Sequence, residues 1–151
     1  MSDDITLEIT NFQNLENYTK TNPQKFRDAV IAYYKKLGEE KGFTVRENFS
    51  IIKNGTNFGK LELLWLEPNV IFTTEFGNIE EIYKHLWKML EAKPSIAVLI
   101  LGSRSGCKPQ EVSKLIDNSD ILKEKRDIFL VIDISEKKVV RRPSALRPQP
   151  C

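Results

Sequence analysis

Two glutamates occupy positions where a plain β-sheet would carry apolar residues. Glu62 lies inside the apolar run 60–66, and Glu75 closes the apolar run 70–75. A tight turn at 67–69 would join the two runs as antiparallel strands and bring the two carboxylates close together. Neighbouring carboxylates in a partly buried site repel each other unless they are protonated or share a cation. A hard divalent cation such as Mg²⁺ favours this oxygen-only environment.

A plainer alternative is that both glutamates face solvent on the sheet surface, paired with Lys53 or Lys60. Leucines flank Glu62 at both strand parities, which is unusual for a strand with one solvated face. The residues alone therefore leave two hypotheses open: a metal site made by Glu62 and Glu75, or two surface acids.

Hydrophobic periodicity indicates the elements that would position these acids. Asn22-Pro23 opens a run of helical spacing, and Asn54-Gly55 is a strong hairpin turn. Asn78 with Glu81 resembles a capping box, and residues 5–12 alternate loosely, as in a short strand or a lead-in. This pattern predicts the α/β class, with a mixed β-sheet flanked by helices. The predicted order is a helix from 22 that ends near 38–42, strands at 43–53, 60–66 and 70–76, a helix at 79–90, a strand at 96–101, a short helix from 109 and a strand at 128–134.

Length and composition predict one soluble domain. The chain has 151 residues, of which 40% are hydrophobic and 29% charged, a balance typical of globular proteins. Its two cysteines form neither a disulfide framework nor a zinc motif, and its acidic start lacks an apolar signal segment. The longest aliphatic run, 96–101, is too short to span a bilayer. We therefore expect an intracellular, cytoplasmic protein that does not associate with membranes.

Charge is concentrated at the C-terminal end. Residues 136–151 hold five basic residues and one acid, a net charge of +4, so residues 1–135 carry −2 of the overall +2. Three prolines in the same segment oppose regular structure. We therefore predict a domain at 1–135 and a basic, proline-containing tail at 136–151. The tail is either a solvated end or cloning remnant, or an arm that contacts phosphate.

Three segments in this order resemble the PD-(D/E)xK nuclease superfamily, which includes restriction endonucleases and Holliday-junction resolvases. They read GFTVRE at 42–47, GKLELL at 59–64 and VIFTTE at 70–75. The α-β-β-β-α-β core of that superfamily matches the elements predicted between 22 and 101, about half of the chain. The resemblance implies a restriction-endonuclease-like fold and metal-dependent hydrolysis of DNA phosphodiesters with Mg²⁺ or Mn²⁺.

The resemblance also implies roles for individual residues. Glu62 takes the first acidic position of the family, where aspartate is usual. In one register Glu75 is the acid of the (D/E)xK motif, and Gly77 stands where its lysine should be. In the other register Thr73 stands at the acid and Glu75 at the lysine. We prefer the first register, because it keeps Glu62 and Glu75 as two metal-binding carboxylates.

The absent motif lysine normally orients and activates the attacking water. Lys60, or Lys84 on the following helix, is the candidate substitute. Many family members also carry a glutamate on the first helix, a position for which Asp28, Glu39 and Glu40 are the candidates.

Basic residues would then contact the DNA backbone: Lys53, Lys60, Arg141 and Arg142. The leading prediction is a Mg²⁺- or Mn²⁺-dependent nuclease acting on DNA. The alternative, motivated by the absent lysine, is a catalytically degenerate nucleic-acid-binding or assembly module of the same fold, which could act as a homodimer.

Other signals are weaker. The lone His85 is typical of a helix surface, and 102–106 is predicted as a loop near the nucleic acid. Trp65 and Trp87 stand at apolar positions and are predicted to lie in the core.

Overall fold

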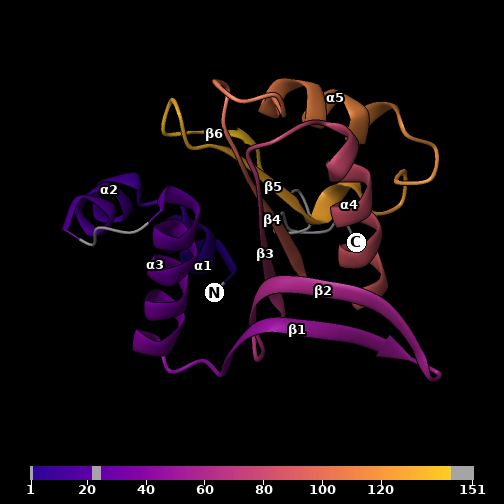
Figure 1. The fold of residues 1–151 in the computed structure, drawn as a ribbon, viewed down its shortest axis with the longest axis horizontal. Helices are drawn as coiled ribbons and strands as arrows, with labels where there is room; N and C mark the ends of the chain where they lie inside the picture. Colours follow the sequence, from indigo (N-terminus) through magenta and orange to yellow (C-terminus); the bar gives the residue numbers. More distant parts are fainter. Residues whose placement is uncertain (1, 22–24, 144–151) are drawn as a thin grey trace, which may run out of the picture.

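A six-stranded mixed sheet forms the centre of the molecule (Figure 1). The computed structural model describes residues 2–21 and 25–143. The strands lie in sequence order across the sheet, antiparallel from the first to the third, parallel from the third to the fifth, and antiparallel at the last pair. They are β1 (Val45–Lys53), β2 (Thr56–Trp65), β3 (Val70–Glu75), β4 (Ile96–Leu101), β5 (Phe129–Asp133) and β6 (Lys138–Arg141).

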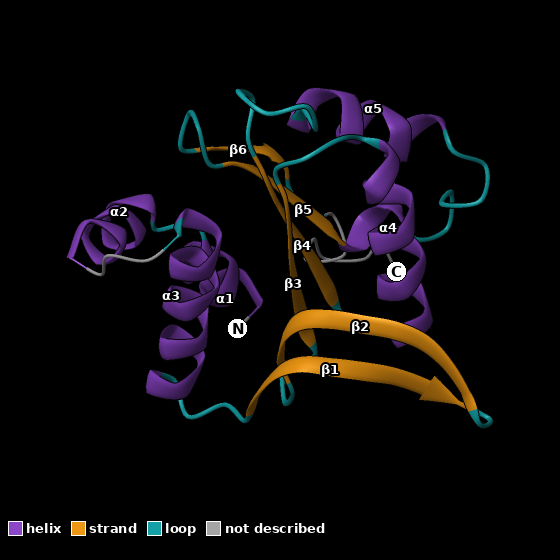
Figure 2. Cartoon of the chain, viewed as in Figure 1, coloured by secondary structure: helices purple, strands orange, loops and turns teal. Residues whose placement is uncertain are grey.

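Helices cover both faces of this sheet (Figure 2). On one face lie α1 (Ser2–Ile9), α2 (Phe12–Thr21) and α3 (Phe26–Glu40), and on the other lie α4 (Glu80–Ala92) and α5 (Pro109–Asn118). A short 3₁₀ turn, Arg126–Ile128, leads into β5. The predicted α/β class, with a mixed sheet flanked by helices, is confirmed. None of the described helices combines the length and the apolar character needed to cross a membrane.

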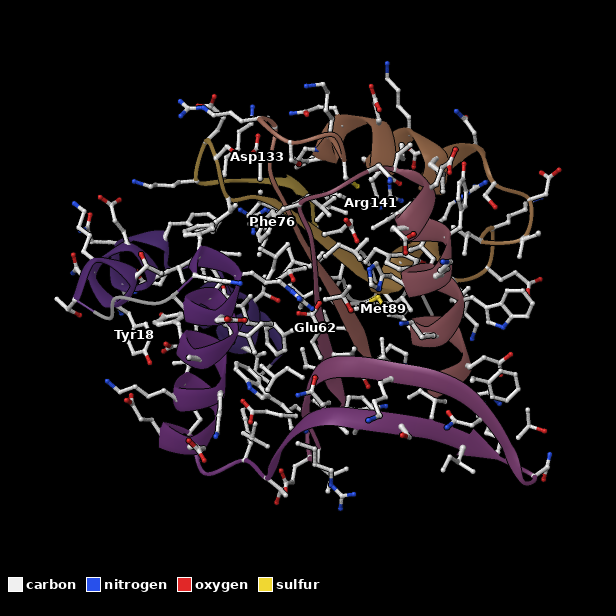
Figure 3. The ribbon with its side chains drawn as sticks, viewed as in Figure 1. Tyr18, Glu62, Phe76, Met89, Asp133 and Arg141 are labelled. Atoms are coloured by element: carbon white, nitrogen blue, oxygen red, sulfur yellow. The ribbon has the colours of Figure 1, made fainter. Side chains whose placement is uncertain are left out.

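The sheet separates two hydrophobic cores, because successive strand residues point to opposite faces. On the α3 face, the Phe72 ring stacks on Tyr34 with 4.9 Å between centroids and meets Trp65 edge-on at 4.7 Å. On the α4 face, Met89 packs against strand residues such as Leu99 and lies between helix and sheet (Figure 3). Each helix layer is thus held by its own core.

The predicted turn at Asn54-Gly55 joins β1 to β2. Both residues have positive φ values, 52° and 78°, as the two-residue hairpin turn requires. The turn between β2 and β3 uses Asn69, whose φ is 56° and whose side-chain amide donates to the carbonyl of Lys93 at 2.9 Å. These two turns set the antiparallel half of the sheet.

The N-terminal segment differs from the sequence prediction. Residues 5–12 form no strand; they belong to α1, the following bend and the start of α2. The apolar alternation was misleading, because Ile5 and Ile9 are also four residues apart and share one helix face. Ile9 is fully buried, and the Tyr34 hydroxyl donates to its carbonyl at 2.7 Å.

The C-terminal boundary also differs. The predicted tail at 136–151 contains β6, which pairs with β5 through Val131 and Arg141. Val139 and Val140 supply the apolar contacts that a four-residue edge strand needs to stay on the sheet. The sheet therefore extends past the predicted boundary at 135, and residues 144–151 lie outside the described part of the chain.

Candidate functional site

Glu62 is engaged by hydrogen-bond donors from β3 and α3. Its Oε1 accepts the backbone N–H of Thr74 at 2.8 Å, and the Thr74 hydroxyl lies within 3.0 Å of both carboxylate oxygens. The Arg27 guanidinium reaches Oε2 at 3.1 Å and also contacts the Thr74 hydroxyl. Only 13% of the Glu62 side chain is exposed, so these donors replace most of its water. Figure 3 shows Glu62 near the middle of the sheet.

The local backbone explains why Glu62 reaches Thr74. The ladder between β2 and β3 ends at the pair Leu63 and Phe72, so the main chain of β2 offers Thr74 no partner. The Glu62 carboxylate takes the place of that missing ladder bond. It keeps the N–H of Thr74 paired at the point where the two strands separate.

A change of strand parity turns Glu62 toward α3. Leu61 and Leu64 both belong to the α4-side core, whereas Leu63 belongs to the α3-side core. In a regular strand, residues three apart point to opposite faces. The ladder places Asn48, whose φ is 46°, across from Glu62, and this distortion accompanies the switch.

Glu75 lies on the other face, next to α4. Its Oε1 is 2.9 Å from Nε2 of His85, and its Oε2 accepts the backbone N–H of Gly77 at 2.7 Å. Both partners of the His85 pair are mostly covered, with 18% and 13% of the side chains exposed. Glu75 thus links the end of β3 to α4.

The structure therefore does not bring the two predicted metal acids together. Glu62 contacts α3 and Glu75 contacts α4, and the sheet lies between these helices. The expected convergence was wrong because it assumed regular alternation through β2. Glu62 contacts Thr74. Thr73 and Glu75 are the neighbours of Thr74 in β3 and point to the opposite face of the sheet, so the motif positions of neither register lie on the same face as Glu62.

The two candidate catalytic lysines have other contacts than the two acids. Lys84 is exposed on α4 and contacts Glu81 at 3.5 Å. Lys60 is exposed on β2, and its carbonyl accepts the ammonium of Lys88 at 2.9 Å. Within the described residues, neither lysine forms an ion pair with Glu62 or Glu75.

The basic residues that were predicted to contact the DNA backbone divide into two groups. Lys53 lies 3.5 Å from Glu91, and Arg141 binds Asp117 at 2.6 Å with only 18% of its side chain exposed. Arg141 thus ties β6 to α5. Lys60 and Arg142 are exposed and have no ion-pair partner within the described residues. Lys88, which sequence reasoning missed, adjoins Lys60; its spacing of four residues from Lys84 on a helix was the available signal.

A polar pocket of about 310 Å³ lies beside Glu62 between α3 and β1. Asp28, Glu47 and Asn48 line it together with Glu62 and Arg27, so Asp28 is the first-helix acid that approaches Glu62. Glu39 and Glu40 do not line it. The described residues contain no group of three histidine, cysteine, aspartate or glutamate side chains that could hold a metal ion. Because Glu62 is already bound by Arg27 and Thr74, a Mg²⁺ or Mn²⁺ ion at this carboxylate would compete with these donors.

A further polar cluster lies at the carboxyl end of β5. Asp133 is fully buried, and its Oδ1 accepts the backbone N–H groups of Ser103, Ser135 and Glu136 at 3.0–3.3 Å. These bonds hold the predicted loop 102–106 against the turn that follows β5. An aspartate at the end of an apolar strand was the sequence signal for this cluster.

Comparisons of the chain with protein-family models, with curated proteins and with solved structures find no match.

Proposed function

We propose that this chain is a nucleic-acid-binding module with a nuclease-like core that does not hydrolyse its ligand. The order α3, β1, β2, β3, α4, β4 follows the α-β-β-β-α-β order of restriction-endonuclease-like proteins, which supports this placement. The chain would thus bind DNA, as the sequence predicted, but would not hydrolyse its phosphodiester bonds.

The absence of hydrolysis is inferred from the positions of Glu62 and Glu75, which contact different partners on opposite faces of the sheet. Glu62 accepts bonds from Arg27 and Thr74 on one face, and Glu75 contacts His85 on the other. A cation at Glu62 would have to displace a guanidinium and two further donors. Each glutamate is therefore interpreted as a structural acid.

Two lysines support the binding part. We call Lys60 and Lys88 the hairpin lysines: the Lys88 ammonium on α4 donates to the backbone carbonyl of Lys60 on β2, and a Cβ added at Gly59 would lie 2.9 Å from the Lys88 side chain. Neither has an acidic partner within the described residues. Surface ammonium groups that have no acidic partner attract phosphate without reading sequence.

The test measures binding of labelled single- and double-stranded DNA by fluorescence anisotropy in EDTA, over a series of salt concentrations. We expect binding at low salt that weakens steeply as salt rises. The double variant Lys60→Ala/Lys88→Ala should reduce the slope of log Kobs against log salt by about 2, because two phosphate contacts are lost.

Lys114→Ala/Lys125→Ala is the matched control, since it removes two exposed lysines elsewhere and leaves the same net charge. An equal loss in both double variants would show that the hairpin lysines have no special role. Absence of binding at low salt would reject the proposal.

Metal-dependent hydrolysis remains the competing prediction and has its own assay. Supercoiled, linear and branched DNA are incubated with Mg²⁺ or Mn²⁺ and the wild-type chain, Glu62→Gln or Glu75→Gln. The proposal expects no cleavage by any of them. Cleavage by the wild type that either variant abolishes would overturn the non-hydrolytic assignment.

A further inference from the structure

An apolar groove runs between α4 and α5 on the outer side of the helix layer. Its volume is about 720 Å³, and we call it the α4–α5 groove. Its apolar lining includes Tyr83, Leu86, Trp87, Leu90, Leu115 and Ile121.

Three of these apolar side chains are largely exposed to solvent, although burial of apolar surface is favourable. The exposed fraction is 64% for Trp87, 57% for Tyr83 and 88% for Ile121. Trp87 was predicted to lie in the core, but Leu86 and Met89 are the α4 residues that face the sheet. Single exposed apolar residues are ordinary, whereas several around one groove mark an interaction surface.

We propose that the α4–α5 groove binds a second copy of this chain. In this dimer the two α4 helices pack antiparallel about a two-fold axis that passes near Trp87. The contact is isologous, so the same residues of both copies meet in exchanged positions.

Charge complementarity along α4 supports this occupant and this direction. Lys84 and Glu91 are seven residues apart and therefore lie on the same flank of the helix. Within one protomer Lys84 contacts Glu81, and Glu91 contacts Lys53 and the Trp87 indole, so pairing across the dimer axis exchanges or adds to these contacts. An antiparallel pair centred near Trp87 places Lys84 of each protomer opposite Glu91 of its partner, twice in the dimer. A parallel pair would set this charged flank against the Tyr83 and Leu90 flank of the partner, where neither charge finds its complement, which disfavours that arrangement.

The side of α4 that lines the groove also matches its counterpart in the antiparallel dimer. Tyr83 and Leu90 are also seven residues apart, and both line the groove. The antiparallel pair therefore sets the Tyr83 ring against Leu90 of the partner, while Trp87 meets its own counterpart at the axis. Aromatic rings at the centre of a contact are typical of interface hot spots.

The available area suits the centre of a standard interface. A large aromatic side chain offers roughly 150–250 Å² when fully exposed, so Tyr83, Trp87 and Ile121 together provide on the order of 400 Å². A stable interface buries about 800 Å² per partner and surrounds an apolar centre with polar residues. The charged residues along α4 would supply that rim.

The test is sedimentation velocity of the full chain up to about 100 µM, a concentration at which a dimer with a micromolar Kd is mostly associated. We expect a dimer. Lys84→Glu and Glu91→Lys should each shift the protein toward monomer by at least tenfold in Kd, and the double variant Lys84→Glu/Glu91→Lys should restore the dimer. Rescue by charge exchange separates a contact between protomers from a folding defect.

Lys25→Glu is the control, because it makes the same charge change on an exposed residue at the start of α3, on the other face of the sheet. It should leave the dimer intact. A chain that stays monomeric at about 100 µM overturns the proposal. So does a dimer that neither Lys84→Glu nor Trp87→Ala weakens. A monomer whose tryptophan fluorescence is quenched by single-stranded DNA would assign the groove to base stacking instead.

Discussion

Replacing Glu62 with alanine should destabilise the fold, because this carboxylate completes the hydrogen bonding of β3. In Glu62→Ala the backbone N–H of Thr74 loses its acceptor at a point where β2 has no ladder partner to offer. The side chain is 13% exposed, so water replaces the lost bonds only in part. An active-site carboxylate would behave differently, since removing a functional acid often leaves stability unchanged or raises it.

The magnitude follows from the individual contacts. A hydrogen bond to a charged acceptor contributes about 1.5–3 kcal/mol, and the N–H and hydroxyl of Thr74 both depend on Glu62. The ion pair with Arg27 adds less than about 1 kcal/mol, because 59% of that arginine is exposed and screened by solvent. We therefore expect Glu62→Ala to cost about 2–4 kcal/mol and Glu62→Gln, which keeps one oxygen acceptor, about 1 kcal/mol.

Urea unfolding at pH 7, followed by circular dichroism, measures the free energy of unfolding for each variant. A loss of about 3 kcal/mol corresponds to a decrease in Tm on the order of 10 °C in a chain of this size. Glu47→Ala serves as the matched control, because among the described residues Glu47 makes one exposed ion pair, 3.4 Å from Lys35. It should change the free energy by less than about 0.5 kcal/mol.

The reasoning is refuted if Glu62→Ala unfolds with the free energy of the wild type or with a higher one. That result would mean that the bonds to Thr74 and Arg27 contribute nothing to stability. Glu62 would then be a carboxylate kept for chemistry, and the nuclease prediction would regain support.

Three further predictions concern other parts of the molecule. Gly38→Ala should cost about 3 kcal/mol and perturb tryptophan fluorescence, since the added Cβ would lie 2.3 Å from Nε1 of Trp65. The Lys137 ammonium lowers the pKa of Glu16 from 4.5 to about 2, so the stabilisation is complete above pH 4.5 and is lost as pH falls toward 2. Glu16→Gln should therefore flatten the fall of Tm over that range, and an unchanged Tm profile would contradict the ion pair. Burial raises the pKa of the Cys107 thiol to about 11, so iodoacetamide at pH 8 should modify it only after unfolding, as site-resolved mass spectrometry can establish.

The middle of the fold was predictable because local signals and burial agree there. The predicted strand 96–101 is β4, and all six of its residues are buried between two helix layers. Asn54-Gly55 forms the predicted turn because few other residue pairs adopt two successive positive φ values. The predicted capping box before α4 forms only in part: the side chain of Asn78 accepts the N–H of Glu81, but Ile79 is the residue that caps the helix and the Glu81 side chain contacts Lys84.

The position of Glu62 was not predictable, because it depends on an irregularity in β2. Pattern analysis assumes that successive residues alternate, and one reversal between Leu61 and Leu63 moves a side chain to the opposite face. The reversal coincides with Asn48 on the neighbouring strand, a residue that carries no apolar signal. The Glu62 carboxylate therefore contacts Thr74 and does not lie beside Glu75, as had been predicted.

The two ends of the chain were missed for a different reason. α1 is short, and its apolar residues fit a strand as well as a helix, so only packing against α3 decides between them. β6 has four residues, and its basic side chains resemble a solvated tail. Both elements owe their structure to a partner formed elsewhere in the chain.

The sequential strand order has a consequence for synthesis on the ribosome. Each strand pairs with the one made just before it, so the sheet can grow step by step as the chain emerges. The first helices cannot be completed in the same way, because Ile9 shares its core with Leu130 and Ile132 of β5. A nascent chain that stops before β5 leaves part of this core open, although β2, β3 and β4 already contribute to it, and such chains should depend on chaperones more than the finished protein does.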